Sequence, residues 1–222
     1  MSRGDHAVGC DTLLLGVTGS VGALSMPAYA GMFRQYFARD VFVMMSPAAA
    51  RFVTPYAFEL YTDHAVFCDT FDRGEGVKVA HVELCARADL FVIAPATANI
   101  LGKCAAGVCD ELISTAVVAC TAPVVFVPSM NDVMWRSKVV QRNVATLREL
   151  GHHVLEPARG LEIVDLKPSF GAMPSFQELV HGLRAVLAPG RSAPRAALSR
   201  SRSSRRNAAH PRPSARRPGR RS

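Results

Sequence analysis

The sequence lacks the features that identify membrane-spanning and secreted proteins. No window holds the roughly 18 consecutive apolar residues that a membrane span needs. The chain begins MSRGDH, which does not pair a positive charge with an apolar stretch as secretory signals do. We therefore expect a cytoplasmic protein without membrane association. The length of 222 residues fits one ordinary domain, with little left for a second.

Cysteine pairs and metal-ligand spacings are also missing. None of the six cysteines forms a CxxC pair, and without a secretion signal we expect no disulfide framework. The seven histidines give neither an HExxH motif nor a Cys/His cluster, so the sequence predicts no metal site. The cysteines are instead expected to serve as small buried apolar side chains.

Acidic residues are absent from residues 191–222, which hold 11 arginines. The first 190 residues hold the other 15 basic residues and all 18 acidic ones, so their net charge is −3. One leucine and no aromatic residue leave the tail too little apolar surface to fold. We predict one domain over residues 1–190 and a disordered basic tail over 191–222. Without aromatic residues or a folded scaffold, the tail does not identify a nucleic-acid-binding protein.

Apolar runs and helical patterns alternate along the first 190 residues. Strands are predicted at 12–17, 41–45, 90–94, 123–127 and 153–155. Helices are predicted at 20–39, 48–53, 99–120, 137–150 and 176–187. Unbroken apolar strands separated by helices indicate a parallel sheet that is covered on both faces. The predicted class is α/β, a Rossmann- or flavodoxin-like three-layer fold with a mostly parallel sheet, in which ligands bind beyond the carboxyl ends of the strands.

Glycines and serines follow the first two predicted strands. Gly16, Gly19 and Gly22 form a GxxGxxG pattern, which lets the backbone approach an anion where a helix begins. Ser20 lies within this pattern, and Ser46 follows the second strand. A phosphate is the ligand that these residues favour, although a tight turn with a capping serine gives the same pattern.

Two similar loops follow the third and fourth predicted strands. Each runs from a proline through small residues to an asparagine. Small side chains let a flat ring lie against the backbone, and the amide of Asn99 both donates and accepts hydrogen bonds. His81 precedes the third strand and is a candidate base or substrate-binding group, although a lone histidine is as often structural.

These segments resemble the motifs of the homo-oligomeric flavin-containing cysteine decarboxylases. That family joins peptidyl-cysteine decarboxylases of lantibiotic-type biosynthesis with phosphopantothenoylcysteine decarboxylases of coenzyme A synthesis. Residues 95–100, PATANI, are similar to its PASANT motif, with threonine for the first serine and isoleucine for the last threonine. Residues 128–135, PSMNDVMW, fit its PxMNxxMW motif at every fixed position. His81, 14 residues before Pro95, matches its active-site histidine, and the resemblance covers about residues 11–157.

The resemblance implies FMN as the cofactor, in a cleft completed by a neighbouring subunit. The phosphate would lie near the first two strand ends, and the flavin ring along the third and fourth. The implied cofactor-binding residues are Gly19, Ser20, Ser46, Pro95, Ala96, Thr97, Ala98, Asn99, Ser129 and Met130. The implied assembly is a homo-oligomer built on trimers, of which a dodecamer is one form.

The resemblance also implies the reaction and its catalytic residues, His81 and Asn131. The C-terminal cysteine of a ribosomally made precursor peptide would be oxidised to a thioaldehyde, lose CO₂ and leave as an enethiol, the precursor of an S-aminovinyl-cysteine. Asn131 would hold the substrate carboxylate and His81 would act as a base or orient the thiol. Residues 156–174 correspond to a mobile clamp over the peptide end, with Phe170 and Met173 as substrate contacts.

The absence of a late cysteine separates the two branches of this family. Coenzyme A enzymes reduce the enethiol with a cysteine in an ACGxxGxGRM-type segment, whereas this chain has no cysteine after Cys120. The sequence therefore favours the peptide-modifying branch, and a phosphopantothenoylcysteine decarboxylase is the alternative. Flavin prenyltransferases are disfavoured because their arginine-rich phosphate-binding segments are missing. Non-catalytic regulatory relatives are disfavoured because His81 and Asn131 are both present.

Overall fold

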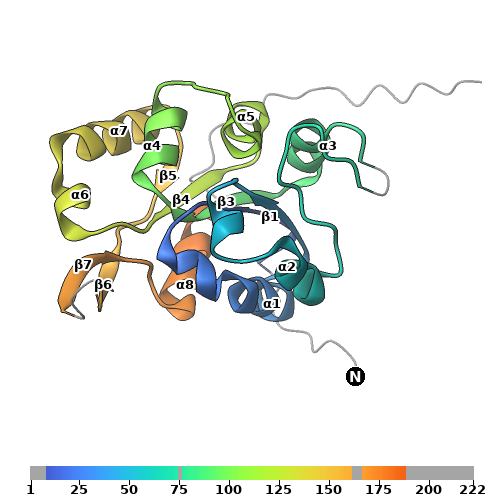
Figure 1. Cartoon of the computed structure of the whole chain (residues 1–222), viewed down its shortest axis with the longest axis horizontal. Helices are drawn as coiled ribbons and strands as arrows, with labels where there is room; N and C mark the ends of the chain where they lie inside the picture. The colour runs from blue at the N-terminus through green and yellow to red at the C-terminus, as the bar shows by residue number, and fades with distance from the viewer. Residues whose placement is uncertain (1–8, 75–76, 162–166, 189–222) are drawn as a thin grey trace, which may run out of the picture.

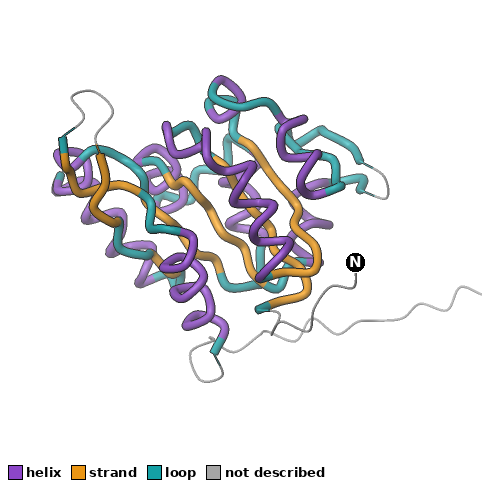
Figure 2. Tube along the Cα trace, turned by 90° about the horizontal axis from the view of Figure 1, so that it is seen from below, coloured by secondary structure: helices purple, strands orange, loops and turns teal. Residues whose placement is uncertain are grey.

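The computed structural model describes residues 9–74, 77–161 and 167–188, so the predicted tail lies outside the described residues. A five-stranded parallel sheet forms the centre of the molecule (Figure 2). Its strands are β1 (Cys10–Val17), β2 (Ala38–Met45), β3 (Leu90–Ala96), β4 (Val124–Pro128) and β5 (His153–Val154). Their order in the sheet is β2-β1-β3-β4-β5. This is the flavodoxin-like order, and it confirms the predicted fold class.

Helices cover both faces of the sheet (Figure 1). One face carries α1 (Met26–Tyr36), α2 (Pro55–Thr62) and α8 (Phe176–Leu187). The other carries α3 (Ala80–Arg87), α4 (Ala98–Ala105), α5 (Leu112–Ala119) and α7 (Lys138–Glu149). A short helix, α6 (Asp132–Arg136), lies beyond the end of β4. The three layers predicted from the sequence are therefore present.

Neighbouring side chains of each central strand enter different cores. Leu14 of β1 and Phe91 of β3 pack with α4 and α5, whereas Leu15 and Val92 pack with α1 and α8. All four are fully buried. Side chains alternate between the two faces of a strand, so a strand covered on both sides must be apolar throughout. Burial of each such side chain contributes about 1.5–3 kcal/mol.

The single helix predicted over residues 20–39 is wrong. A 3₁₀ turn, η1 (Val21–Ser25), comes first, then α1, and β2 begins at Ala38. Pro27 lies in the first turn of α1, where its missing N–H removes no helical hydrogen bond. The predicted phosphate loop therefore leads into a 3₁₀ turn, and no α-helix begins at Ser20. The helical stretch predicted at 48–53 is the 3₁₀ turn η2 (Ala49–Arg51).

A separate two-stranded hairpin occupies the region that the resemblance identified as a clamp. Its strands β6 (Ala158–Leu161) and β7 (Pro168–Ala172) pair antiparallel. The hairpin projects beside α6 and α8 at one end of the main sheet (Figure 1). Within the described ranges, no helix is long and apolar enough to cross a membrane.

Candidate active site

Thr18 joins the ends of β1 and β3, where the order of the strands reverses. Its hydroxyl donates to the carbonyl of Pro95 at 2.6 Å and accepts from the backbone N–H of Thr97 at 3.1 Å. The Thr97 hydroxyl in turn caps α4 by accepting from the N–H of Ile100 at 3.3 Å. Thr18 is only 2% exposed. The two loops are therefore fixed to each other at the switch point, where parallel α/β sheets bind their ligands.

Ser20 and Gly19 shape the loop after β1. The Ser20 hydroxyl accepts from the N–H of Gly22 at 3.4 Å and shares a hydrogen bond of 2.9 Å with the Ser129 hydroxyl beyond β4. At Gly19, a Cβ atom would lie 2.4 Å from Cβ of Ala48. Only glycine lets the loops after β1 and β2 approach so closely.

These loops enclose a cavity of about 520 Å³, which we call the strand-end cavity. It is lined by Thr18, Gly19, Ser20, Val21, Ser46, Ala48, Phe52, Thr97, Ala98, Asn99, Glu111, Ser129, Met130 and Met134. Hydroxyl groups and small side chains dominate this wall, and Glu111 is the one charged residue among the described residues that line it. The buried Ser46 hydroxyl accepts from the N–H of Ala49 at 3.2 Å, which leaves its own proton free to donate.

A second cavity of about 460 Å³, the hairpin cavity, adjoins the first. It is lined by Ser20, Val21, Gly22, Ser25, Tyr29, Ser129, Met130, Asn131, Gly160, Ser169, Phe170, Gly171, Ala172 and Met173. The Asn131 side-chain oxygen caps α6 by accepting from the N–H of Met134 at 2.8 Å. Its amide NH₂ has no partner among the described residues. Asn131 therefore presents a fixed donor to this cavity.

The hairpin is held against the β4–α6 loop through its backbone. The N–H of Met130 donates to the carbonyl of Gly171 at 3.0 Å. Gly171 has a φ of +133°, and a Cβ atom there would lie 2.1 Å from the carbonyl oxygen of Met130. The close contact thus requires glycine, and it places Phe170 and Met173 in the wall of the hairpin cavity.

Residues 3–188 match the model of the family described as Flavoprotein. The chain belongs to this family. Mersacidin decarboxylase from Bacillus sp. (strain HIL-Y85/54728) is 35% identical over 176 residues, which cover 79% of this flavoprotein and 87% of the relative. The coenzyme A biosynthesis bifunctional protein CoaBC from Bacillus subtilis (strain 168) is 36% identical over 148 residues, which cover 67% of this chain but 36% of CoaBC.

A solved structure gives the same result. The crystal structure of SpaF, described as one of the FMN-dependent cysteine decarboxylases, has a TM-score of 0.67 and 34% sequence identity to this flavoprotein. The match covers 80% of this chain and 97% of SpaF. Fold and sequence thus lead to the family that the motifs indicated.

Most predicted site residues of this flavoprotein lie in the two cavities, but three do not. Pro95 and Ala96 are buried in β3, and Pro95 contributes through the carbonyl that binds Thr18. His81, in the first turn of α3, lines neither cavity. Its Nδ1 atom is buried and has no hydrogen-bond partner among the described residues. Within one chain, His81 therefore does not line the cavity that contains Asn131.

Thr18 and Tyr29 are among the site residues that the sequence did not predict. Thr18 stood between the glycines of the GxxGxxG pattern, and its position directly after a strand was the signal for its role. Tyr29 of α1 lines the hairpin cavity. Burial, followed by the nearby carboxylate of Glu178, raises the pKa of Tyr29, so its hydroxyl stays a neutral donor.

Proposed function

We propose that this flavoprotein catalyses the FMN-dependent oxidative decarboxylation of the C-terminal cysteine of a ribosomally made precursor peptide. The observation that carries the proposal is the pair of adjoining cavities. Their common wall is formed by Ser20, Val21, Ser129 and Met130. The strand-end cavity suits a phosphate and a flat ring, and the hairpin cavity contains the amide of Asn131. The similarity to mersacidin decarboxylase and SpaF supports the same reaction.

The residues of the strand-end cavity fit FMN. The hydroxyls of Ser20 and Ser46 are neutral groups that can donate to a phosphate, and Gly19 lines the cavity beside them. Ala98 and Asn99 form a low wall against which a flat ring can lie. When bound, FMN supplies the two-electron oxidation that gives the cysteine a thioaldehyde carbon able to accept the electrons released with CO₂.

Asn131 is proposed to hold the substrate carboxylate. Because its oxygen is engaged with α6, only its N–H groups point to the ligand, and these match a carboxylate. Met130, Phe170 and Met173 line the same cavity and exclude water from the reacting group. Asn131 would thus orient the C-terminal end of the peptide, and the apolar side chains would shield it from water.

His81 is proposed to act in the cavity of a neighbouring copy, within a homo-oligomer built on trimers. Its Nδ1 atom has no hydrogen-bond partner among the described residues, and apolar side chains next to it in the sequence are exposed. Val79 is 42% and Val82 52% exposed. An interface on this surface would cover them and bring His81 of the partner subunit to the substrate thiol, where an imidazole can move or hold the proton.

Mass spectrometry of cysteine-ended peptides tests the reaction. The flavin-loaded protein is expected to lower the peptide mass by about 46 Da, equal to CO₂ and two hydrogens. A loss of about 44 Da from phosphopantothenoylcysteine, with no change in any peptide, would favour the function suggested by the CoaBC similarity. A yellow protein that alters neither substrate would contradict both.

Asn131→Asp isolates the role of the amide. Aspartate preserves the cap of α6 but removes the donor and adds a repelling charge. We expect flavin content and unfolding temperature close to wild type, with decarboxylation lowered about 100-fold or more. Normal turnover by this variant would remove Asn131 from the mechanism.

Co-expression tests the shared site. Chains carrying His81→Asn or Asn131→Asp alone are expected to be inactive. In randomly mixed trimers about a quarter of the sites would combine an intact His81 with an intact Asn131, so activity returns to about that fraction. No recovery in oligomers shown to contain both chains would place the two residues in the same subunit's site.

A further inference from the structure

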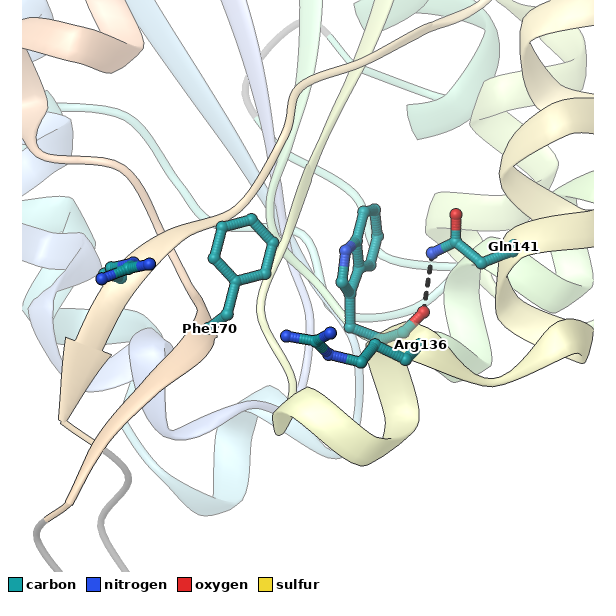
Figure 3. Close-up of a pocket in the computed structure, with 5 residues that line it drawn as sticks. Arg136, Gln141 and Phe170 are labelled. Carbon is teal, nitrogen blue, oxygen red and sulfur yellow. Dashed lines mark hydrogen bonds between the residues drawn. The ribbon is translucent and has the colours of Figure 1, made fainter.

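A third cavity, of about 530 Å³, shares Phe170 with the hairpin cavity. We call it the arginine cavity. It is lined by Trp135, Arg136, Gln141, Arg159 and Phe170 (Figure 3). Its two arginines come from different elements, α6 and the hairpin strand β6. Two cations beside an aromatic wall make this cavity chemically unlike the two that adjoin each other.

Some polar groups that line the arginine cavity have no hydrogen-bond or ion-pair partner among the described residues. Nε of Arg136 donates to Asp132 at 2.7 Å, which leaves the terminal nitrogens of the guanidinium, and that group points toward the Phe170 ring (Figure 3). Gln141 donates to the Trp135 carbonyl at 2.6 Å. Arg159 has no ion-pair partner among the described residues. Asp132 offsets the charge of Arg136, so the excess positive charge of the cavity is that of Arg159.

The arginine cavity is continuous with the proposed substrate site through two elements. Phe170 lines both the arginine and hairpin cavities. Helix α6 has Asn131 as its N-cap and Arg136 as its last residue. Five residues of helix advance about 7–8 Å. An extended peptide covers that distance in two or three residues, at about 3.3–3.6 Å each.

We propose that the arginine cavity is a specificity subsite for an acidic side chain two or three residues before the C-terminal cysteine of the peptide. The inference rests on the proposed function, because it takes the cysteine carboxylate to lie at Asn131. A guanidinium matches a carboxylate in shape as well as charge, and Arg136 and Arg159 both line the cavity together with Phe170. The subsite selects the acidic peptide and disfavours one with lysine at that position.

Peptides of identical length test the subsite. Each ends in cysteine and carries Glu, Gln or Lys at one of the second, third or fifth positions before it. Binding to the flavin-loaded protein is measured by the fluorescence anisotropy of labelled peptides, and kcat/KM by the loss of mass. We expect Glu to be preferred over Gln about three- to tenfold at the second or third position, Lys to be the poorest, and the fifth position to have no effect.

A charge reversal links this preference to the cavity. Arg159→Glu is expected to invert the order, so that the lysine peptide binds best. Arg142→Glu is the matched control, since Arg142 is exposed on α7 outside the cavity, and this variant should keep the wild-type order. Both variants carry the same change in net charge, so a difference between them reports position.

Three results would overturn the inference. The first is equal binding of the Glu, Gln and Lys peptides. The second is an Arg159→Glu variant that keeps the acidic preference. The third is a dependence of binding on negative charge that is seen with the phosphate of phosphopantothenoylcysteine and with no peptide. Failure of the proposed function is a separate result: no peptide would be decarboxylated, whereas the binding measurement would still rank the three peptides. Turnover that ignores peptide charge would leave the proposed function standing and remove the subsite.

Discussion

Substitution of Gly171 by alanine is expected to detach the hairpin and spare the core. The residue holds a φ of +133°, and a Cβ atom at this position would lie 2.1 Å from the carbonyl oxygen of Met130. Neither the strand nor the β4–α6 loop can absorb such an overlap while the hydrogen bond of 3.0 Å between them persists. The side chain therefore forces the two segments apart.

The free energy that Gly171→Ala costs is larger than the stability of the hairpin. A backbone conformation that suits only glycine costs another residue about 1–3 kcal/mol. Loss of the hydrogen bond between Met130 and Gly171 adds about 1 kcal/mol. A two-stranded hairpin is marginally stable by itself, so a total of about 2–4 kcal/mol is expected to release β6 and β7 and leave the main sheet folded.

Peptide turnover and flavin content together measure this effect. For Gly171→Ala we expect kcat/KM to fall about 30- to 1,000-fold, because Phe170 and Met173 leave the substrate wall. Flavin absorbance should persist, since no described residue of the hairpin lines the strand-end cavity. Gly151→Ala is the matched control: its φ is +88°, but nothing lies within 4 Å of the added Cβ.

The control separates backbone strain from the clash. Gly151→Ala is expected to lose about 1 kcal/mol of stability and to keep wild-type turnover. A Gly171→Ala variant with an unchanged kcat/KM would refute the role of the hairpin contact. Equal loss of turnover in both variants would attribute the effect to strain alone.

A substitution of Thr18 and a chemical labelling of the cysteines test groups of the site and of the core. Thr18→Val removes the hydroxyl that joins β1 to β3. We expect the free energy of unfolding to fall by about 1–3 kcal/mol and FMN to be lost faster than from the wild type. Release of FMN at the wild-type rate would show that this hydroxyl is not needed for cofactor binding. Burial raises the pKa of Cys10 and of Cys104 to about 12, so at pH 8 iodoacetamide should modify the exposed Cys109 before either, as peptide mapping would show. Labelling of the buried Cys104 before Cys109 would mean that the fold opens there.

The main sheet could be predicted because its strands are covered on both faces. The runs at Leu13–Leu15 and Leu90–Ala94 are apolar without interruption, and such runs occur where both sides of a strand are buried. The helix ends were harder to predict. Apolar spacing continued through residues 20–39, and only Pro27 marked the point where α1 begins, since a proline is tolerated in a first turn.

The location of most site residues at the strand ends could be predicted, but the contacts between them could not. The loops at the strand ends contain most of the predicted residues because a parallel sheet gathers its carboxyl ends at one edge. The role of Thr18 depends on partners 77 and 79 residues away, which no local pattern reveals. The hairpin was equally hidden, because β6 and β7 are short and depend on Gly160 and Gly171 rather than on alternating apolar residues.

Helix α8 sets the limit for shortening the protein from its C-terminal end. It follows the hairpin along the chain, yet it packs against α1, with the rings of Phe176 and Phe33 5.1 Å apart and Leu179 and Leu183 fully buried. A variant that stops after the hairpin would uncover the apolar side of α1 and free the hairpin at its second end. Fusion partners and affinity tags therefore belong beyond Leu187 rather than at the end of β7.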